Sequence, residues 1–390
     1  MNGSGRRKIL FVIDSFNIGG AERSLCTLLG LLPAEKFDIS VMLTSGGGPL
    51  EKYLPPDVRL SEIPLCADDL KSRLRFRFHH LRHALISRMA RQRNLRSNPV
   101  ELYWTEMGCL APAPAESYDV AIAYHQGFPT YFVAEKVKAA RKIAWINADI
   151  VRDNYSEAFN LRFYHLYNKV VTASARLRDL LLDAWHFRPE QLLPIRDIVS
   201  SALLRRLAGG DDSAPGQHSG PLRLLTVGRL APVKGYDLLI ATAALLRDRG
   251  FSFRWDIIGD GPMREEIRRL ISRHSMEEHV TLLGPIDNPY PWMRSCDIYI
   301  QPSRSEGYGI AVCEAKAFCR PVIVTDFKVA PELIDHGRDG LIASMTAESL
   351  ADAVTRLASP QLREKISSQI AASDSDDTSE SLRLVLELLD

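Results

Sequence analysis

Residues Ser303–Glu314 read SRSEGYGIAVCE and follow a strand-like run that ends at Ile300, and a helix-like run begins at Ile310. The glycines of this stretch let the backbone turn sharply and come close to a ligand. The N–H groups that open the helix would then point at a phosphate. Glu306 in the loop and Glu314 about one turn into the helix add hydroxyl acceptors, so the stretch favours a sugar-nucleotide site. On spacing alone, a loop carboxylate and a solvated first-turn carboxylate favoured by the helix dipole are an equally good interpretation.

The composition is that of an ordinary globular protein. The 390 residues predict two domains of ~100–200 residues each, and 46% hydrophobic with 25% charged residues is usual for a soluble fold. The net charge of +1 indicates no acidic partner. The six cysteines show neither a CxxC pair nor metal-ligand spacing, which predicts reduced cytosolic thiols. The apolar run Ile9–Ile13 is too short for a secretory signal or a spanning helix, and predicts the first strand of a buried parallel sheet.

Polar and glycine-rich residues follow the strands of the first half. Gly19 and Gly20 come between the first strand and a helix, where the doubly wound fold collects ligands and a diphosphate could approach; a plain strand-to-helix turn is the alternative. The spacing is not GxGxxG, so it does not indicate a nicotinamide or flavin cofactor. His125 follows the strand-like run 118–124, and we expect it at the carboxyl end of that strand, as either a catalytic or a structural histidine.

The order of strand-like and helix-like runs predicts two β/α units joined by a linker. Residues 203–220 become rich in Gly, Asp and Ser and read as flexible. The runs that follow repeat the architecture of the first half. We therefore predict a first domain over 1–202, a linker over 203–220, a second domain over 221–375, and a C-terminal helix over 376–390 that packs back on the first domain.

Residues 71–97 form the one strongly biased segment. They contain many Arg and His residues and no Asp or Glu, and five apolar residues recur at helical spacing on one face: Leu74, Phe78, Leu81, Leu85 and Met89. A basic amphipathic helix of this kind can lie in an anionic membrane interface. A solvated basic face over a domain core explains the pattern equally well. Nucleic-acid binding is less favoured, because no known nucleic-acid-binding module surrounds the segment.

Four motifs, taken in order, resemble a known family. The second half reads VGRLAPVKGYDLLI from Val227, IIGDGP from Ile257 and SEGYGIAVCEA from Ser305, and the first half reads IGGAERSL from Ile18. The set resembles the retaining glycosyltransferases of the GT-B fold in glycosyltransferase family four (glycosyl transferases group 1). The resemblance covers nearly the whole chain. It implies an α/β fold of two Rossmann-like doubly wound domains that face a central cleft, with the acceptor bound by the first domain and the nucleotide sugar by the second.

The resemblance also implies roles for individual residues. Arg229 and Lys234 would clamp the donor diphosphate, because phosphate favours cationic donors; a surface pair on a loop is the alternative. Glu306 would face the donor sugar and Glu314 would bind the ribose hydroxyls. The remaining donor-binding positions are Gly19, Gly20, Ile286, Gly307, Tyr308, Gly309 and Ile310. The catalytic candidates are Glu306, Arg229, Lys234 and His125. Many relatives carry a histidine after the strand that ends here at Asn147, so the acceptor side departs from the family pattern.

The implied reaction is transfer of a sugar with retention of its anomeric configuration, from a nucleotide diphospho-sugar, most simply a UDP-sugar. No metal and no cofactor are expected. In the front-face mechanism proposed for the family, the leaving phosphate takes the acceptor proton, so the protein supplies positioning and charge stabilisation. The acceptor would be a glycan or a lipid-linked glycan of envelope or capsular polysaccharide synthesis. The enzyme would then be cytoplasmic, peripheral at the inner face of the plasma membrane. A soluble small-molecule acceptor, or a non-catalytic nucleotide-sugar-binding protein, remains an alternative.

Overall fold

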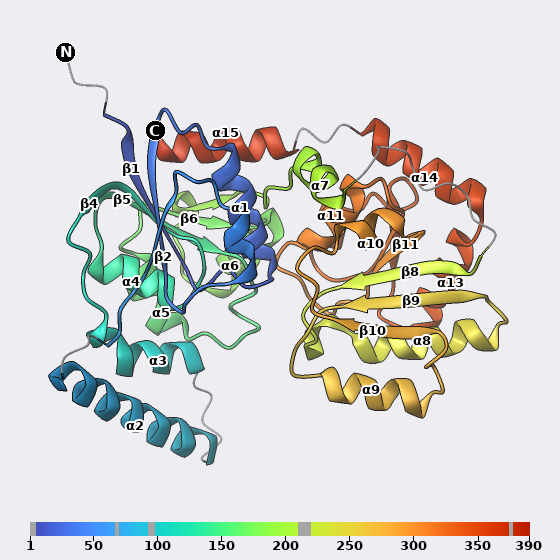
Figure 1. The fold of residues 1–390 in the computed structure, drawn as a ribbon, viewed down its shortest axis with the longest axis horizontal. Coiled ribbons are helices and arrows are strands. Elements are labelled where there is room, and N and C mark those ends of the chain that lie inside the picture. Colours follow the sequence, from blue (N-terminus) through green and yellow to red (C-terminus); the bar gives the residue numbers. More distant parts are fainter. Residues whose placement is uncertain (1–4, 67–69, 93–97, 210–219, 374–376) are drawn as a thin grey trace. The chain divides into compact units, whose positions relative to one another are not determined.

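A computed structural model describes residues 5–66, 70–92, 98–209, 220–373 and 377–390. The chain divides into two compact units. Unit 1 consists of Met1–Asp197 together with Ser379–Asp390, and unit 2 of Ile198–Thr378. Figure 1 shows the elements of both along the chain.

Unit 1 contains a seven-stranded parallel sheet in the order β3-β2-β1-β4-β5-β6-β7. Its strands are β1 (Arg7–Ile13), β2 (Phe37–Leu43), β3 (Arg59–Glu62), β4 (Ser117–Ala123), β5 (Lys138–Ile146), β6 (Lys169–Thr172) and β7 (Leu192–Pro194). Its helices are α1 (Gly20–Leu31), α2 (Leu70–Gln92), α3 (Pro99–Met107), α4 (Phe128–Lys136), α5 (Glu157–Tyr164), α6 (Ala175–Ala184) and α15 (Asp377–Leu389). The strand order reverses between β1 and β4, which pair directly with each other. In such a sheet this switch point is where ligands bind.

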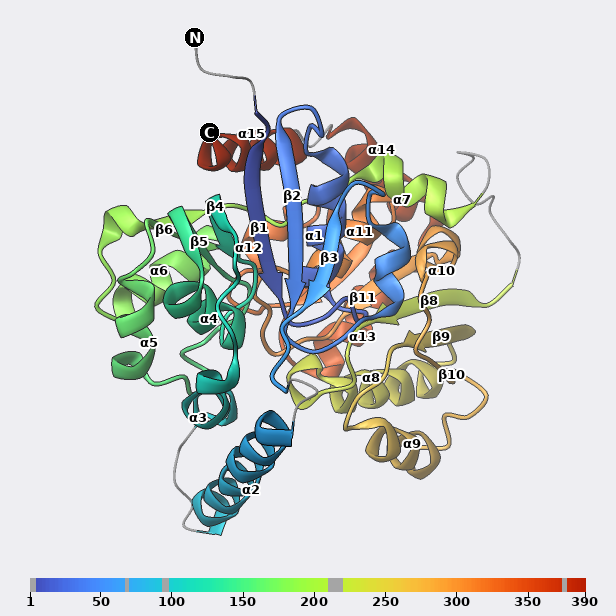
Figure 2. The same cartoon turned by 60° about the vertical axis from the view of Figure 1, so that its left-hand side comes forward.

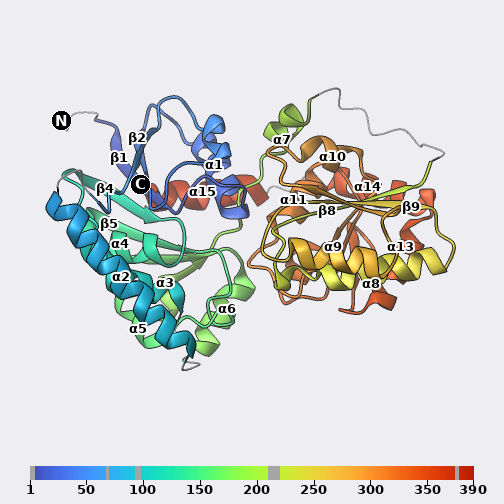
Figure 3. The same ribbon diagram turned by 60° about the horizontal axis from the view of Figure 1, so that its bottom comes forward.

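The core of unit 1 lies on both faces of this sheet. The run Ile9–Ile13 is fully buried, as expected of a central parallel strand whose two faces are covered. Alternate residues of β1, such as Leu10 and Val12, belong to a cluster that includes Trp104 of α3 and Tyr131 of α4. Figure 3 shows α3, α4 and α5 on this side of the sheet and α1 and α15 on the other.

Unit 2 contains a six-stranded parallel sheet in the order β10-β9-β8-β11-β12-β13. Its strands are β8 (Leu222–Val227), β9 (Phe253–Ile258), β10 (Val280–Gly284), β11 (Ile298–Gln301), β12 (Val322–Thr325) and β13 (Gly340–Ala343). Its helices are α7 (Ser201–Ala208), α8 (Tyr236–Asp248), α9 (Arg264–Arg273), α10 (Tyr290–Ser295), α11 (Ile310–Ala317), α12 (Ala330–Leu333), α13 (Ala347–Leu357) and α14 (Pro360–Ala372). The switch point lies between β8 and β11, which pair directly.

The two parallel sheets with their crossover helices confirm the predicted α/β class with two Rossmann-like doubly wound domains. The units divide after Asp197, whereas the first domain was predicted to end at residue 202. Residues 203–208 of the expected flexible linker (203–220) are instead helical, because they belong to α7, and residues 210–219 lie outside the described part of the chain. The segment Ser379–Asp390 belongs to unit 1.

Candidate functional site

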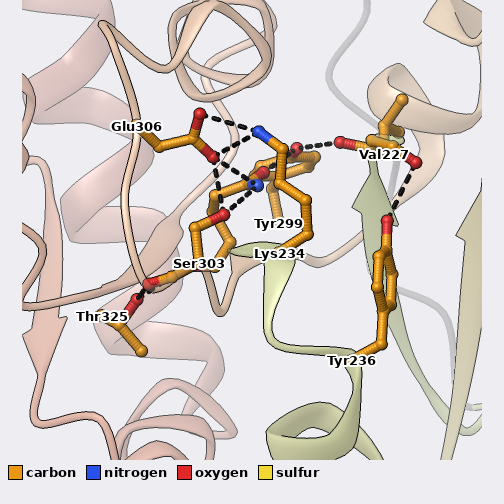
Figure 4. A network of polar contacts seen from close by, with 9 residues as sticks. Val227, Lys234, Tyr236, Tyr299, Ser303, Glu306 and Thr325 are labelled. Atoms are coloured by element: carbon orange, nitrogen blue, oxygen red, sulfur yellow. Dashed lines mark hydrogen bonds and ion pairs between the residues drawn. The ribbon is translucent and has the colours of Figure 1, made fainter. Parts of the chain in front are cut away.

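The loop that joins β11 to α11 holds Glu306 in a closed network of polar contacts (Figure 4). The Oε1 atom of Glu306 accepts hydrogen bonds from Ser303 Oγ at 2.6 Å and from Gln301 Nε2 at 3.0 Å. The ammonium group of Lys234 lies 2.7 Å from both carboxylate oxygens. The Glu306 side chain is only 9% exposed, so this negative charge is compensated by an ion pair and by two further hydrogen bonds.

A second set of contacts fixes the groups that hold Glu306. Tyr299 donates its hydroxyl proton to Gln301 Oε1 at 2.6 Å, and Gln301 Nε2 donates to Ser303 Oγ at 2.8 Å. The Ser303 carbonyl in turn accepts a hydrogen bond from the Thr325 hydroxyl on β12. Tyr299, Gln301, Ser303 and Thr325 are all buried. The carboxylate is therefore held in one orientation before any ligand arrives, as a preorganised site requires.

Lys234 reaches Glu306 because the loop after β8 closely approaches the loop after β11. Lys234 ends a short 3₁₀ turn, η4 (Pro232–Lys234), and Gly235 follows with φ +69°. A Cβ atom at Gly235 would lie 2.0 Å from the carbonyl oxygen of Pro302, so a glycine is required at this contact. Arg304 joins the two loops, since its guanidinium donates to the Pro232 carbonyl at 3.2 Å. It also donates to both carboxylate oxygens of Asp237, in the first turn of α8, at 2.8 and 2.6 Å.

The glycine-rich stretch itself forms the entry to α11. Gly309 precedes the helix with φ +103°, and a Cβ atom there would lie 2.8 Å from Leu333 Cδ1. Tyr308 is buried, whereas Gly307 and Ile310 are half-buried. The carboxyl ends of the neighbouring strands β8 and β11 therefore present a lysine, a carboxylate and the first backbone N–H groups of a helix together.

The other predicted donor-binding residues of unit 2 do not join this network. Arg229 is exposed, and its guanidinium makes no ion pair with any residue that the structure describes. Glu314 is only 1% exposed and accepts a hydrogen bond from the Tyr290 hydroxyl at 2.9 Å, so it is not the solvated helix residue that the alternative interpretation proposed. Ile286 is half-buried in the loop after β10.

In unit 1, polar residues gather at the carboxyl ends of β1 and β4. Asp14 follows β1, and its Oδ2 atom lies 2.5 Å from His125 Nδ1. Thr44, after β2, donates to Asp14 Oδ1 at 2.8 Å. Gly19 precedes α1 and Gly20 is its first residue. The histidine and both glycines were predicted from the sequence as site residues, but Asp14 was not, because its one signal is that a carboxylate directly follows a buried strand.

The Asp14–His125 contact sets the charge of both groups. Burial is the largest single influence on His125 and lowers its pKa, but the hydrogen bond and negative charge of Asp14, with the charge of Glu22, outweigh burial and raise the pKa of His125. Burial likewise tends to raise the pKa of Asp14, and the hydrogen bond and positive charge of His125 outweigh it, so the pKa of Asp14 is lowered. The pair therefore favours an imidazolium beside a carboxylate.

Asn147 stands close to this pair, where many relatives of the resembled family have a histidine. Its side-chain amide donates to the Tyr124 carbonyl at 2.7 Å, and its backbone N–H donates to Gln126 Oε1 at 3.1 Å. The Gln126 amide nitrogen lies 3.2 Å from His125 Nε2. Asn147 therefore supports the backbone around His125.

Within the described ranges, no three His, Cys, Asp or Glu side chains gather as a metal site would require. No helix in the part of the chain that the structure describes has both the length and the apolar character to cross a bilayer.

Comparison with protein families and curated proteins gives one consistent result. Residues 221–359 match the family model described as "Glycosyl transferases group 1". Alpha-D-kanosaminyltransferase of Streptomyces kanamyceticus is 34% identical over 152 residues, which is 38% of this chain and 39% of that protein. The putative colanic acid biosynthesis glycosyltransferase WcaL of Salmonella typhimurium is 30% identical over 192 residues, 45% and 47% of the two chains. This chain thus spans less than half the length of these relatives.

The solved structures that resemble this chain agree with its fold over nearly its full length. Anabaena HepE in complex with UDP and glucose has a TM-score of 0.70 and 19% sequence identity, and the alignment covers 98% of this chain and 99% of that one. A Staphylococcus aureus TarM variant in complex with UDP has a TM-score of 0.72 and 14% identity, over 98% and 100% of the two chains. These likenesses confirm the GT-B fold.

Proposed function

We propose that this chain, whose residues 221–359 match the family model of the glycosyl transferases group 1, transfers a sugar from a nucleotide diphospho-sugar to a glycan or lipid-linked acceptor. The observation that carries the proposal is the contact of Lys234 with Glu306 at 2.7 Å, at the switch point of unit 2. A cation and a carboxylate fixed side by side suit a ligand that carries phosphates next to hydroxyl groups. UDP in the solved structures with this fold supports UDP-sugars as the donor class.

The two oxygens of Glu306 differ in a way that suggests how the donor binds. Oε1 is held by Ser303, Gln301 and Lys234, whereas Lys234 is the one partner of Oε2 among the residues that the structure describes. A phosphate would attract the Lys234 ammonium by its larger negative charge. Oε2 would then be free to accept a hydrogen bond from a hydroxyl of the donor sugar. Glu306 thus orients the sugar while Lys234 neutralises the leaving diphosphate.

Arg229 supplies a second cation for the diphosphate. Its guanidinium is exposed and has no ion-pair partner in the described chain, so a phosphate need not displace any carboxylate from it. Forked guanidinium donors match phosphate oxygens well. Glu314 would bind the ribose hydroxyls, which requires some opening of its buried surroundings. The reaction would retain the anomeric configuration and would need neither metal nor cofactor.

His125 is the side chain of unit 1 that would contact the substrate, and Asp14 is the residue that holds His125 in position. An imidazolium held beside a carboxylate can donate a hydrogen bond to a sugar hydroxyl or to the departing phosphate. Gly19 and Gly20, at the start of α1, would let a diphosphate approach that helix. The role of His125 implies that activity depends on its charge.

The names of the relatives support an acceptor in polysaccharide assembly. They include glycosyltransferases of colanic acid and amylovoran biosynthesis and a poly(ribitol-phosphate) alpha-N-acetylglucosaminyltransferase. We therefore infer an envelope or capsular glycan acceptor and a peripheral enzyme at the inner, cytoplasmic face of the plasma membrane.

A thermal-shift screen with UDP, GDP, ADP and their sugars tests the donor class, because a ligand that binds only the folded state raises the melting temperature. Release of the nucleoside diphosphate in the presence of glycan acceptors then tests transfer. Proton NMR of the product gives the anomeric configuration, and inversion would rule out the retaining reaction. Binding of a sugar nucleotide with neither transfer nor hydrolysis would favour the non-catalytic alternative.

A further inference from the structure

Helix α2 has one face packed on the rest of unit 1. It lies beside α3 as the outermost element of the unit in Figure 2. Arg82 Nε lies 2.8 Å from Oε2 of the buried Glu106, and the ring of His83 makes an edge contact with that of Tyr103, 5.4 Å between centroids. Arg75 donates to the Cys109 carbonyl. These contacts fix which side of the helix faces solvent.

The solvent side of α2 carries a row of large apolar residues, here called the apolar ridge. Its members and their exposed fractions are Leu74 58%, Phe78 62%, Leu81 69%, Leu85 60% and Met89 41%. At 3.6 residues per turn, positions 74, 78, 81 and 85 fall on one face, opposite the one that holds His83. A continuous exposed row of this kind marks an interaction surface. It also argues against the alternative that these residues cover a domain core.

Cations border the apolar ridge on both sides. The helical angle places Arg73, Arg77 and Arg88 along one edge and Lys71, Arg75 and Arg82 along the other, and these side chains are exposed. Arg75 and Arg82 are also engaged in the contacts with unit 1 given above. No Asp or Glu occurs between residues 70 and 92. Apolar side chains in the middle with cations at both edges match a bilayer surface, where the apolar side enters the headgroup and acyl boundary while the cations meet lipid phosphates.

We propose that the apolar ridge of α2 and its flanking cations dock unit 1 on an anionic lipid bilayer. A nucleic acid would use the cations but would leave Leu81 and Phe78 in water. The opposite charge of anionic lipid headgroups explains both the cations and the lack of acids, since each basic residue near such a surface adds about 1 kcal/mol. Docking would serve the transfer of a sugar to a lipid-linked acceptor, and this use of it rests on the proposed function. Docking itself needs neither donor nor acceptor.

The test is sedimentation of the full-length chain with vesicles of phosphatidylcholine, with and without phosphatidylglycerol. A flank variant carries Lys71→Gln, Arg77→Gln and Arg88→Gln, which spares the Arg82 and Arg75 contacts with unit 1. A ridge variant carries Leu74→Gln, Phe78→Gln, Leu81→Gln and Leu85→Gln. A control variant removes three exposed cations elsewhere: Arg269→Gln, Arg273→Gln and Lys365→Gln. All substituted side chains are exposed, and thermal melting of each variant checks that it folds.

We expect the wild-type chain and the control variant to bind only the vesicles with phosphatidylglycerol. The flank variant should bind them about a hundredfold more weakly, which is about 3 kcal/mol for three basic residues. The ridge variant should lose at least as much, and binding should weaken as salt screens the charges. Failure of the wild-type chain to sediment, or binding that both α2 variants retain, would overturn the proposal.

The apolar ridge could instead bind a second copy of the chain, and light scattering of the chain without vesicles tests this alternative. A dimer that the ridge variant dissociates would assign the apolar ridge to a second copy of the chain and would overturn lipid docking. Vesicle sedimentation is measured without a sugar-nucleotide donor, so its result tests lipid docking separately from the proposed sugar transfer. A chain that binds UDP-sugars but no vesicles would lose only the docking surface, and one that binds vesicles but no donor would lose only the proposed transfer.

Discussion

Replacing Lys234 by Met removes the cation that lies 2.7 Å from both oxygens of Glu306 and keeps most of the apolar stem. Breaking a fully buried ion pair costs about 3–5 kcal/mol. Here the Lys234 and Glu306 side chains are 22% and 9% exposed, and Ser303 and Gln301 still donate to the carboxylate. We therefore expect a loss of about 2–3 kcal/mol. At about 3 °C per kcal/mol for a unit of this size, the melting temperature of unit 2 should fall by about 6–9 °C.

The opposite replacement should cost less. Glu306→Gln leaves the Lys234 ammonium, which is more exposed and can bind water, so we expect a loss of about 1 kcal/mol. The double variant Lys234→Met with Glu306→Gln leaves no unpaired charge and should be more stable than Lys234→Met alone. A double-mutant cycle by calorimetry should give a coupling energy of about 1–2 kcal/mol.

The pair Lys316–Asp339 provides a matched control in the same unit. Its contact is 2.6 Å and its side chains are 22% and 15% exposed, but it lies outside the proposed donor site. Lys316→Met should reduce stability by a similar amount and leave UDP binding unchanged, whereas Lys234→Met should also weaken UDP binding at least tenfold, or about 1.4 kcal/mol. Additive losses in the cycle, or equal UDP affinities of the two variants, would refute the reasoning.

Three other changes test other parts of the site. Asp14→Asn removes the charge that raises the pKa of His125, so the limb of the pH profile of kcat/KM that reports His125 should move to lower pH. In the wild type, the stability that this pair adds is full between about pH 4 and about pH 6.5, and it is lost as pH rises through the raised pKa of His125 or falls through the lowered pKa of Asp14. Gly235→Ala should destabilise unit 2 by at least about 2 kcal/mol in thermal melts, and by more than Gly337→Ala, which has a similar positive φ but open space around it. Arg229→Ala should change stability by less than about 0.5 kcal/mol, because this side chain is exposed, but should weaken UDP binding in calorimetric titration.

Much of the fold was predictable from local patterns. Short apolar runs such as Ile9–Ile13 become buried parallel strands because both faces of the sheet are covered, and glycines after them mark the turns into helices. The local pattern of the stretch Ser303–Glu314 made Glu306 a candidate, whereas Lys234 became one through the family resemblance. Their contact was not predictable, since it joins positions 72 residues apart and depends on the close approach that Gly235 allows.

The periodicity of the sequence did not show whether Glu314 and the apolar residues of α2 are buried or exposed, and the structure does. Glu314 has the spacing of an exposed helix residue, and only the packing of α10 against α11 brings the Tyr290 hydroxyl to it. The apolar positions of α2 have the spacing of a core-facing helix, yet Leu81 is 69% exposed. Asp14 could not be paired with His125 from the sequence, because β1 and β4 are neighbours in the sheet but not along the chain.

The last helix gives the two units a double covalent connection. The chain leaves unit 1 after Asp197 and returns at Ser379, where Ser381, Val385 and Leu389 of α15 are buried. Arg7, at the start of β1, donates to the Leu389 carbonyl at 2.8 Å. Two peptide segments therefore connect the units. Loss of the final dozen residues should weaken the N-terminal unit, although it lies at the opposite end of the sequence.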